Sequence, residues 1–260
     1  MQRQALCIGI NDYPGVGRDL NGCVNDAMDW ATILRERGYE VKCLFNDQAT
    51  LNAMRGALTS LIADVARGDH LVVTFSGFGS FAPTPTDMAR PAQPVWCPWD
   101  VASGEALPVS ELGAMLDIRT KGARAVVISD TCHSGTVTRG DDQSMDPGTA
   151  RMRILPPYTW MNSRSREPLG RMVEVGANVQ VGDIYITACG PHQFAWEGPF
   201  TSRFNGAFTQ YALKVLRQLP PDSSYSTWLK SLRVYLPSTR WPQVPQLFCT
   251  AALSKQAILG

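Results

Sequence analysis

Residues 70–79, His-Leu-Val-Val-Thr-Phe-Ser-Gly-Phe-Gly, decide the fold of this chain. The apolar run up to Phe75 is typical of a buried strand, and it ends abruptly in a Ser-Gly-Phe-Gly loop. A second stretch of the same design runs from Ala125 to Gly135, where Ala-Val-Val-Ile-Ser is followed by Asp-Thr-Cys-His-Ser-Gly. Each of these two strands therefore carries a loop of chemically useful residues directly at its carboxyl end.

Segments typical of strands and of helices alternate along the rest of the chain. Further strands are expected at 5–10, 41–45 and 183–188, and helices at 24–34, 50–66, 109–118, 206–216 and 226–235. This alternation predicts an α/β fold in which a mostly parallel central sheet is flanked by helices on both faces. In such sheets, ligand sites form at the carboxyl ends of the strands, which is where the two loops lie.

The composition is that of an ordinary globular protein. The 260 residues are 44% hydrophobic and 18% charged with a net charge of +1, which favours one domain over 1–260. A charge this small predicts no nucleic-acid binding, and no apolar stretch is long enough to span a membrane. The seven cysteines are dispersed and form no Cys-x-x-Cys pair, which indicates reduced thiols and a cytoplasmic location.

The two loops together resemble the catalytic loops of the caspase-like cysteine peptidases, especially the metacaspases and their bacterial relatives, the orthocaspases. Gly-Ala-Phe-Thr at 206–209 and Pro-Gln-Val-Pro-Gln-Leu at 242–247 extend the resemblance over nearly the whole chain. It implies a caspase-haemoglobinase fold with a large-subunit-like part at 1–135, a loop at 136–170 and a small-subunit-like part at 171–260. It also implies a monomer whose partners are peptide or protein segments.

The resemblance assigns catalytic roles, and one of the matching positions is changed. Cys132 matches the nucleophile of the family, and the backbone N–H groups of Cys132 and Gly79 match the donors that stabilise the oxyanion. The family's first loop reads Ser-Gly-His-Gly, and its His is the general base, but this chain has Phe78 at that position. Because phenylalanine cannot carry a proton, and losing a general base typically costs about 10²–10⁴-fold, we expect an inactive or strongly attenuated pseudo-peptidase.

Three histidines are the alternatives to the missing base. His70 begins the strand that ends before Phe78, so it lies roughly 20 Å or more from that loop. His133 is next to the cysteine, at a position that the family fills with a structural His, and His192 follows a later strand.

Two other interpretations therefore stay open. The chain could be an active cysteine endopeptidase that cuts after Arg or Lys, with another base or with Phe78 as an engineered substitution. In that case the arginines between 139 and 171 offer points for self-processing. The third interpretation is an unrelated α/β binding or hydrolase domain in which Cys132 is structural.

Four residues match the acidic specificity pocket that lets metacaspases accept Arg or Lys: Cys23, Asp26, Ser76 and Asp130. Carboxylates suit a guanidinium or ammonium group, so the resemblance implies recognition of basic segments. From the residues alone, Asp26 could equally cap a helix and Asp130 could simply end a strand.

Many metacaspases need calcium, which is bound in part by an adjacent Asp pair before a helix. The matching stretch at 107–112, Leu-Pro-Val-Ser-Glu-Leu, lacks that pair, while Asp141 and Asp142 are typical of a solvated loop. Calcium prefers six to eight oxygen ligands with several carboxylates. We therefore expect no metal site and no cofactor.

Overall fold

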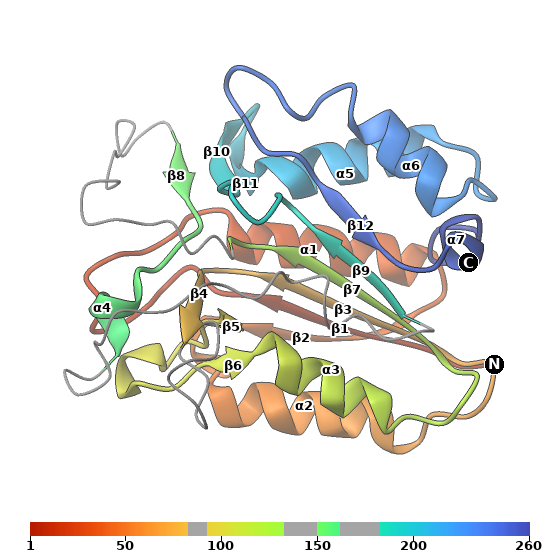
Figure 1. The fold of residues 1–260 in the computed structure, drawn as a ribbon, viewed down its shortest axis with the longest axis horizontal. Coiled ribbons are helices and arrows are strands. Elements are labelled where there is room, and N and C mark those ends of the chain that lie inside the picture. The colour runs from red at the N-terminus through yellow and green to blue at the C-terminus, as the bar shows by residue number, and fades with distance from the viewer. Residues whose placement is uncertain (83–92, 133–149, 162–182) are drawn as a thin grey trace.

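The computed structural model describes residues 1–82, 93–132, 150–161 and 183–260. Its centre is a six-stranded sheet in the order β12–β9–β7–β3–β1–β2 (Figure 1). Five of the strands are parallel: β1 (Arg3–Gly9), β2 (Glu40–Phe45), β3 (His70–Ser76), β7 (Arg124–Asp130) and β9 (Asp183–Thr187). The edge strand β12 (Gln246–Phe248) is antiparallel to β9. The mostly parallel α/β fold is confirmed, and the antiparallel edge is an addition.

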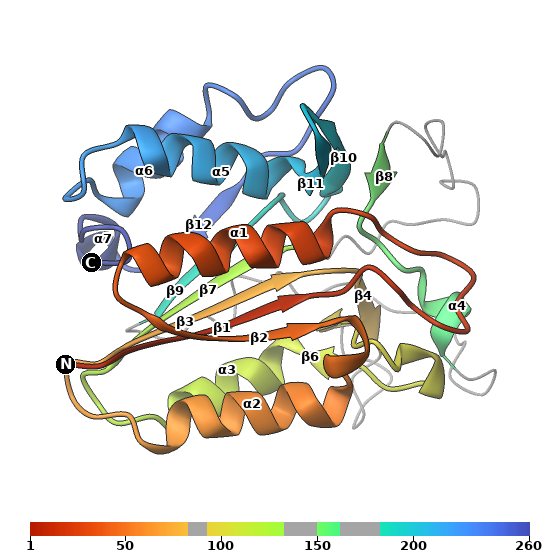
Figure 2. The ribbon, with the colours of Figure 1, turned by 180° about the vertical axis from the view of Figure 1, so that it is seen from behind.

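Helices cover both faces of this sheet (Figures 1 and 2). On one face lie α1 (Cys23–Glu36), α5 (Ala207–Gln218) and α6 (Tyr225–Leu232), and on the other lie α2 (Leu51–Ala63) and α3 (Val109–Asp117). The short helix α7 (Ala251–Ser254) follows β12. None of the helices in the described ranges is long and apolar enough to cross a membrane.

The two faces of the sheet carry separate apolar clusters, because successive residues of a strand point to opposite faces. On β3, Leu71, Val73 and Phe75 join the cluster beneath α2 and α3, whereas Val72 joins the cluster beneath α1, α5 and α6. We call these the α2–α3 cluster and the α1–α5 cluster. Every residue of β3 is buried, as expected for a strand that is covered on both sides.

Two small antiparallel sheets lie beyond the carboxyl ends of the central strands (Figure 1). One contains β4 (Gly79–Ala82), β5 (Gln93–Trp96) and β6 (Leu107–Pro108). The other contains β8 (Arg151–Met152), β10 (Trp196–Phe200) and β11 (Arg203–Gly206). Short 3₁₀ turns occur at η1 (Asn46–Gln48) and η2 (Val101–Ser103).

Of the loop expected at 136–170, the structure describes residues 150–161. Residues 150–161 contain β8 and the short helix α4 (Pro157–Trp160), and Leu155 is completely buried. The order of this segment comes from pairing with β10 and from burial against the α2–α3 cluster. Since neither leaves a periodic pattern in the local sequence, the sequence does not predict it. The other residues of the expected loop lie outside the described ranges.

Candidate active site

The loops after β3 and β7 meet at one carbonyl group. The N–H groups of Gly79 and Cys132 donate to the carbonyl oxygen of Arg153, at 3.1 and 3.2 Å. The strands bring the loops together because Ser76 and Asp130 are neighbours in the register of β3 and β7. A β-carbon at position 79 would lie 1.8 Å from the carbonyl oxygen of Cys132, so this close approach requires a glycine.

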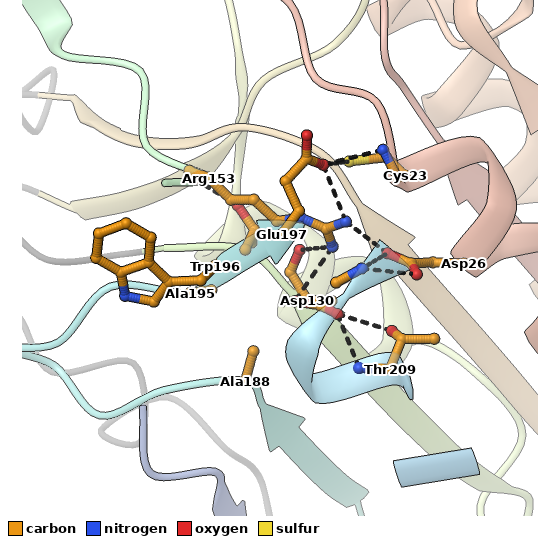
Figure 3. A network of polar contacts seen from close by, with 12 residues as sticks. Cys23, Asp26, Asp130, Arg153, Ala188, Ala195, Trp196, Glu197 and Thr209 are labelled. Atoms are coloured by element: carbon orange, nitrogen blue, oxygen red, sulfur yellow. Dashed lines mark hydrogen bonds and ion pairs between the residues drawn. The ribbon is translucent and has the colours of Figure 1, made fainter. Parts of the chain in front are cut away.

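The side chain of Arg153 lies among three buried carboxylates (Figure 3). Its Nη2 is 2.6 Å from Oδ2 of Asp26 and 3.3 Å from Oε2 of Glu197. Its Nη1 is 3.2 Å from Oδ1 of Asp130 and also donates to the Asp130 carbonyl oxygen. All four side chains are at most 1% exposed. The guanidinium is therefore a completely desolvated cation in an acidic pocket.

Helix starts supply further hydrogen bonds to these carboxylates, beside the Asn205 side chain, which donates to Asp26 at 2.9 Å. Just before α1, the N–H groups of Asn21 and Gly22 donate to Glu197 at 2.7 and 3.0 Å. At the start of α5, the N–H of Gly206 donates to Asp26 at 3.0 Å, and Thr209 donates to Asp130 through its N–H and its hydroxyl. Free N–H groups at helix N-termini favour negative charge. Two helices thus orient and stabilise the acids of the pocket.

The structure gathers the four pocket residues of the sequence analysis at this place and adds a fifth, Glu197. Cys23 begins α1, and its sulfur lies 3.8 Å from Oε2 of Glu197. Ser76 ends β3 beside Asp130 and is buried, and its carbonyl oxygen accepts from Ile10. Sequence reasoning missed Glu197 because a single acid in an irregular stretch carries no motif, and only the pairing of β10 with β8 aims it at Arg153.

The chain around Arg153 lies between β10 and Gly79. On its amino side, Arg151 and Met152 pair antiparallel with β10, and the N–H of Arg153 donates to Ala195. On its carboxyl side, the N–H of Leu155 donates to the carbonyl oxygen of Gly79 at 2.9 Å. The Arg153–Ile154 peptide bond therefore lies at the two donors of Cys132 and Gly79, with backbone contacts on both sides.

The sulfur of Cys132 is buried against the backbone of Ala195. It accepts from the Ala195 N–H at 2.8 Å, and the thiol can donate to the Ala195 carbonyl oxygen at 3.4 Å. Phe78 is also buried, but its ring packs 4.8 Å from the ring of Tyr13 in the α2–α3 cluster, whereas Cys132 belongs to the α1–α5 cluster. The Phe78 N–H donates to the Tyr13 hydroxyl at 2.9 Å, which fixes the loop.

The two histidines in the described ranges lie in different surroundings. His70 pairs with Arg124 at the amino end of β3, the end opposite to Ser76, and burial lowers its pKa. His192 is exposed in the turn after β9, three residues before Ala195. His133 lies outside the described residues, as do Asp141 and Asp142.

Among the described residues, the stretch that matches the calcium site of metacaspases offers one carboxylate, and that carboxylate is already engaged. Glu111 supplies the carboxylate of the 107–112 stretch, and both of its oxygens are bound by Arg55, at 2.6 and 2.9 Å. Within 1–82, 93–132, 150–161 and 183–260, no group of three or more His, Cys, Asp or Glu residues could hold a metal ion. The three pocket carboxylates face a guanidinium instead.

Burial raises the pKa of Asp26 to about 7, while the charge of Arg153 opposes this rise. A carboxyl group whose pKa is higher in the folded state stabilises the fold at low pH, and this contribution is lost as the pH rises towards 7. In the wild type, this titration should lower the unfolding free energy by about 1–4 kcal/mol between pH 4 and pH 7. Asp26→Asn should not show this decrease when urea unfolding is measured across the same pH range. Asp183→Asn is the comparison. Burial raises the pKa of Asp183 to about 6, so this variant should lack the part of the decrease that ends near pH 6. Identical pH profiles for wild type and Asp26→Asn would contradict the assignment.

Gly79→Ala should separate the two loops, because the new β-carbon would overlap Cys132 and the side chain of Thr131. We expect a loss of stability of about 2 kcal/mol or more, measured by urea unfolding. Gly56→Ala is the matched control, since a β-carbon at that position in α2 meets nothing within 4 Å. It should leave stability unchanged or raise it by up to about 1 kcal/mol. Equal effects of the two substitutions would show that the loops tolerate a side chain.

Comparisons with known proteins agree with one another on the family of this chain. The family model described as "Caspase domain" matches residues 2–256. Metacaspase-1 of Mycosarcoma maydis is 35% identical over 95% of this chain and 70% of its own length. Metacaspase-1 of Scheffersomyces stipitis is 26% identical over 96% of this chain and 71% of its own. The crystal structure of protein GSU0716 from Geobacter sulfurreducens superposes with a TM-score of 0.77 and 26% identity, over 100% of this chain and 98% of that one. The chain therefore belongs to the caspase domain family.

Proposed function

We propose that this caspase-like domain is a pseudo-peptidase that recognises arginine but lacks the base needed to cut the bond beside it. One observation carries the proposal. The guanidinium of Arg153 lies in the acidic pocket while the carbonyl oxygen of the same residue accepts from Gly79 and Cys132. A peptidase of this type binds the residue before its cut bond in this manner, with donors aimed at the developing oxyanion.

The proposal of an inactive domain rests on the residues around the sulfur. In the described part of the chain, the two hydrogen bonds of the Cys132 sulfur are both with the backbone of Ala195, which cannot take a proton. By its match to the family's Ser-Gly-His-Gly loop, Phe78 stands at the position of the base, and its ring packs against Tyr13. A thiol needs a base to become the nucleophilic thiolate and to protonate the leaving amine.

The preference for arginine over lysine follows from the two ends of the guanidinium. Nη1 faces Asp130, and Nη2 faces both Asp26 and Glu197. Burial disfavours the charge of Arg153, but the surrounding negative groups, Asp130 foremost, hold its pKa well above the usual value. The planar fork of arginine presents two nitrogens to different acids, which the single nitrogen of lysine does not.

The alternative is an active endopeptidase. The position of Arg153 also fits this alternative, because an active enzyme that has not yet cut itself would hold the arginine before its cut bond in the same place. If another group served as base, the Arg153–Ile154 bond would be its first substrate, because that bond already lies at the donors. His133 and His192 are the histidines that this alternative would use. We further propose that the domain is a monomer in the cytoplasm, a location that suits its dispersed cysteines without a Cys-x-x-Cys pair.

Phe78→His should convert the bound segment into a substrate. The imidazole would take the thiol proton, the sulfur of Cys132 would bond to the carbonyl carbon of Arg153, and the leaving nitrogen of Ile154 would receive the proton. Water would then hydrolyse the thioester. We expect fragments 1–153 and 154–260, detected by intact mass, while the wild type stays whole.

Two variants control this experiment. Phe78→Leu and the double variant Phe78→His with Cys132→Ala should both stay uncut. Cleavage of the wild-type chain after Arg153 would support the active alternative, and His192→Ala would then test its base. A folded but uncut Phe78→His protein would show that a histidine at position 78 does not act as the general base.

Arg153→Ala should empty the pocket and leave three buried carboxylates without their cation. We expect a loss of about 3–5 kcal/mol in unfolding free energy. Millimolar agmatine should restore part of this stability, and pentylamine should restore less. The shift in melting temperature measures both effects. Arg203→Ala is the control, because Arg203 pairs with Asp29 at the surface, and its loss should cost under about 1 kcal/mol with no response to agmatine. Equal responses to agmatine in both variants would rule out an arginine pocket.

A further inference from the structure

We propose that the cleft has a second recognition site, on the leaving side of the arginine, which selects a leucine two residues after it. In this site, Gly79 and Ser80 bind the backbone of Leu155, and the α2–α3 cluster takes its side chain. The domain would therefore recognise segments of the type Arg-Ile-Leu rather than arginine alone. The inference rests on the proposed function, because it assumes that the same cleft binds arginine.

The backbone of Leu155 is bound at both of its polar groups. Its N–H donates to the carbonyl oxygen of Gly79 at 2.9 Å, and its carbonyl oxygen accepts from the Ser80 hydroxyl at 2.6 Å. Gly79 thus uses its N–H for Arg153 and its carbonyl for Leu155. Because both contacts come from one residue of β4, the spacing between the arginine and the leucine is fixed.

The Ser80 hydroxyl is itself held in place. It accepts from the indole N–H of Trp160 at 2.8 Å while it donates to Leu155. Trp160 belongs to α4 and is 5% exposed, so this hydrogen bond is shielded from water. Because the Ser80 oxygen already accepts from Trp160, its O–H is oriented to donate. The group that it binds must therefore be an acceptor, such as a peptide carbonyl.

The side chain of Leu155 gives this site its selectivity. It is completely buried in the α2–α3 cluster, together with Phe78 and Trp96. On the other side of the arginine, Arg151 and Met152 are only partly buried, and their backbone pairs with β10. The Arg151 side chain donates to the Asp19 carbonyl oxygen, and Met152 packs against the α1–α5 cluster. Buried side chains discriminate between residues, whereas backbone pairing accepts most of them. Ile154 is buried as well, in the α1–α5 cluster. Selection therefore lies at the arginine and at the two residues after it, and the α2–α3 cluster is the part that selects the leucine.

The test uses the full chain with Arg153→Ala and Leu155→Ala combined, which weakens the internal segment at both anchor points. Three ligands are titrated into it: a peptide with the sequence of residues 150–155, the same peptide ending in serine, and agmatine. We expect the leucine peptide to bind at least 10-fold more tightly than the serine peptide. Equal binding of the two peptides, or binding of agmatine alone, would overturn the second site and leave the arginine pocket intact. Failure of agmatine and both peptides to bind would contradict the pocket and this site together.

A second measurement does not depend on the double variant. In the otherwise unchanged chain, Leu155→Ala and Ser80→Ala should free the segment and speed the alkylation of Cys132 at least 10-fold, followed by peptide mapping. Leu58→Ala is the matched control, because Leu58 is an equally buried leucine of the α2–α3 cluster on α2. The same acceleration in Leu58→Ala would mean that general loosening, and not loss of this site, exposes the sulfur.

Discussion

The ion pairs of Arg153 are the interaction on which the rest of the site depends. Its guanidinium joins α1, β7 and β10 through Asp26, Asp130 and Glu197, which belong to widely separated parts of the sequence. Removing the cation would leave three carboxylates in a dry interior, and an uncompensated buried charge is far more costly than the pair itself. The arginine is thus both the occupant of the cleft and a component of the folded domain.

The parallel sheet explains why these groups meet. Ligand sites form at the carboxyl ends of such strands, and here the loops after β3 and β7 lie side by side at that edge. The first turns of α1 and α5 approach the same point and aim their N–H groups at the acids. A side chain at position 206 would lie 2.2 Å from Asp130, so the approach of α5 depends on a glycine. The catalytic family motif and the acidic pocket are consequences of one topology.

Much of this could be predicted from the sequence, and the misses have physical causes. The apolar run that ends at Phe75 predicted β3, and the helical spacing of apolar residues in 24–34 predicted α1, because both patterns lie within the local sequence. β8 spans only two residues, and its order comes from pairing with β10, so no local pattern predicts it. In the sequence alone, Arg153 is only one of several arginines between 139 and 171. Its role depends on three acids that no local spacing relates.

The pairing of β7 with β9 has a consequence for a chain that is nicked after Arg153. β7 would belong to the first fragment and β9 to the second, yet the two are hydrogen-bonded neighbours inside one sheet. α1 and α5, which pack on the same face, would likewise come from different fragments. A break in the covalent chain would therefore yield two polypeptides that remain one folded particle, so chain integrity and native assembly must be measured separately.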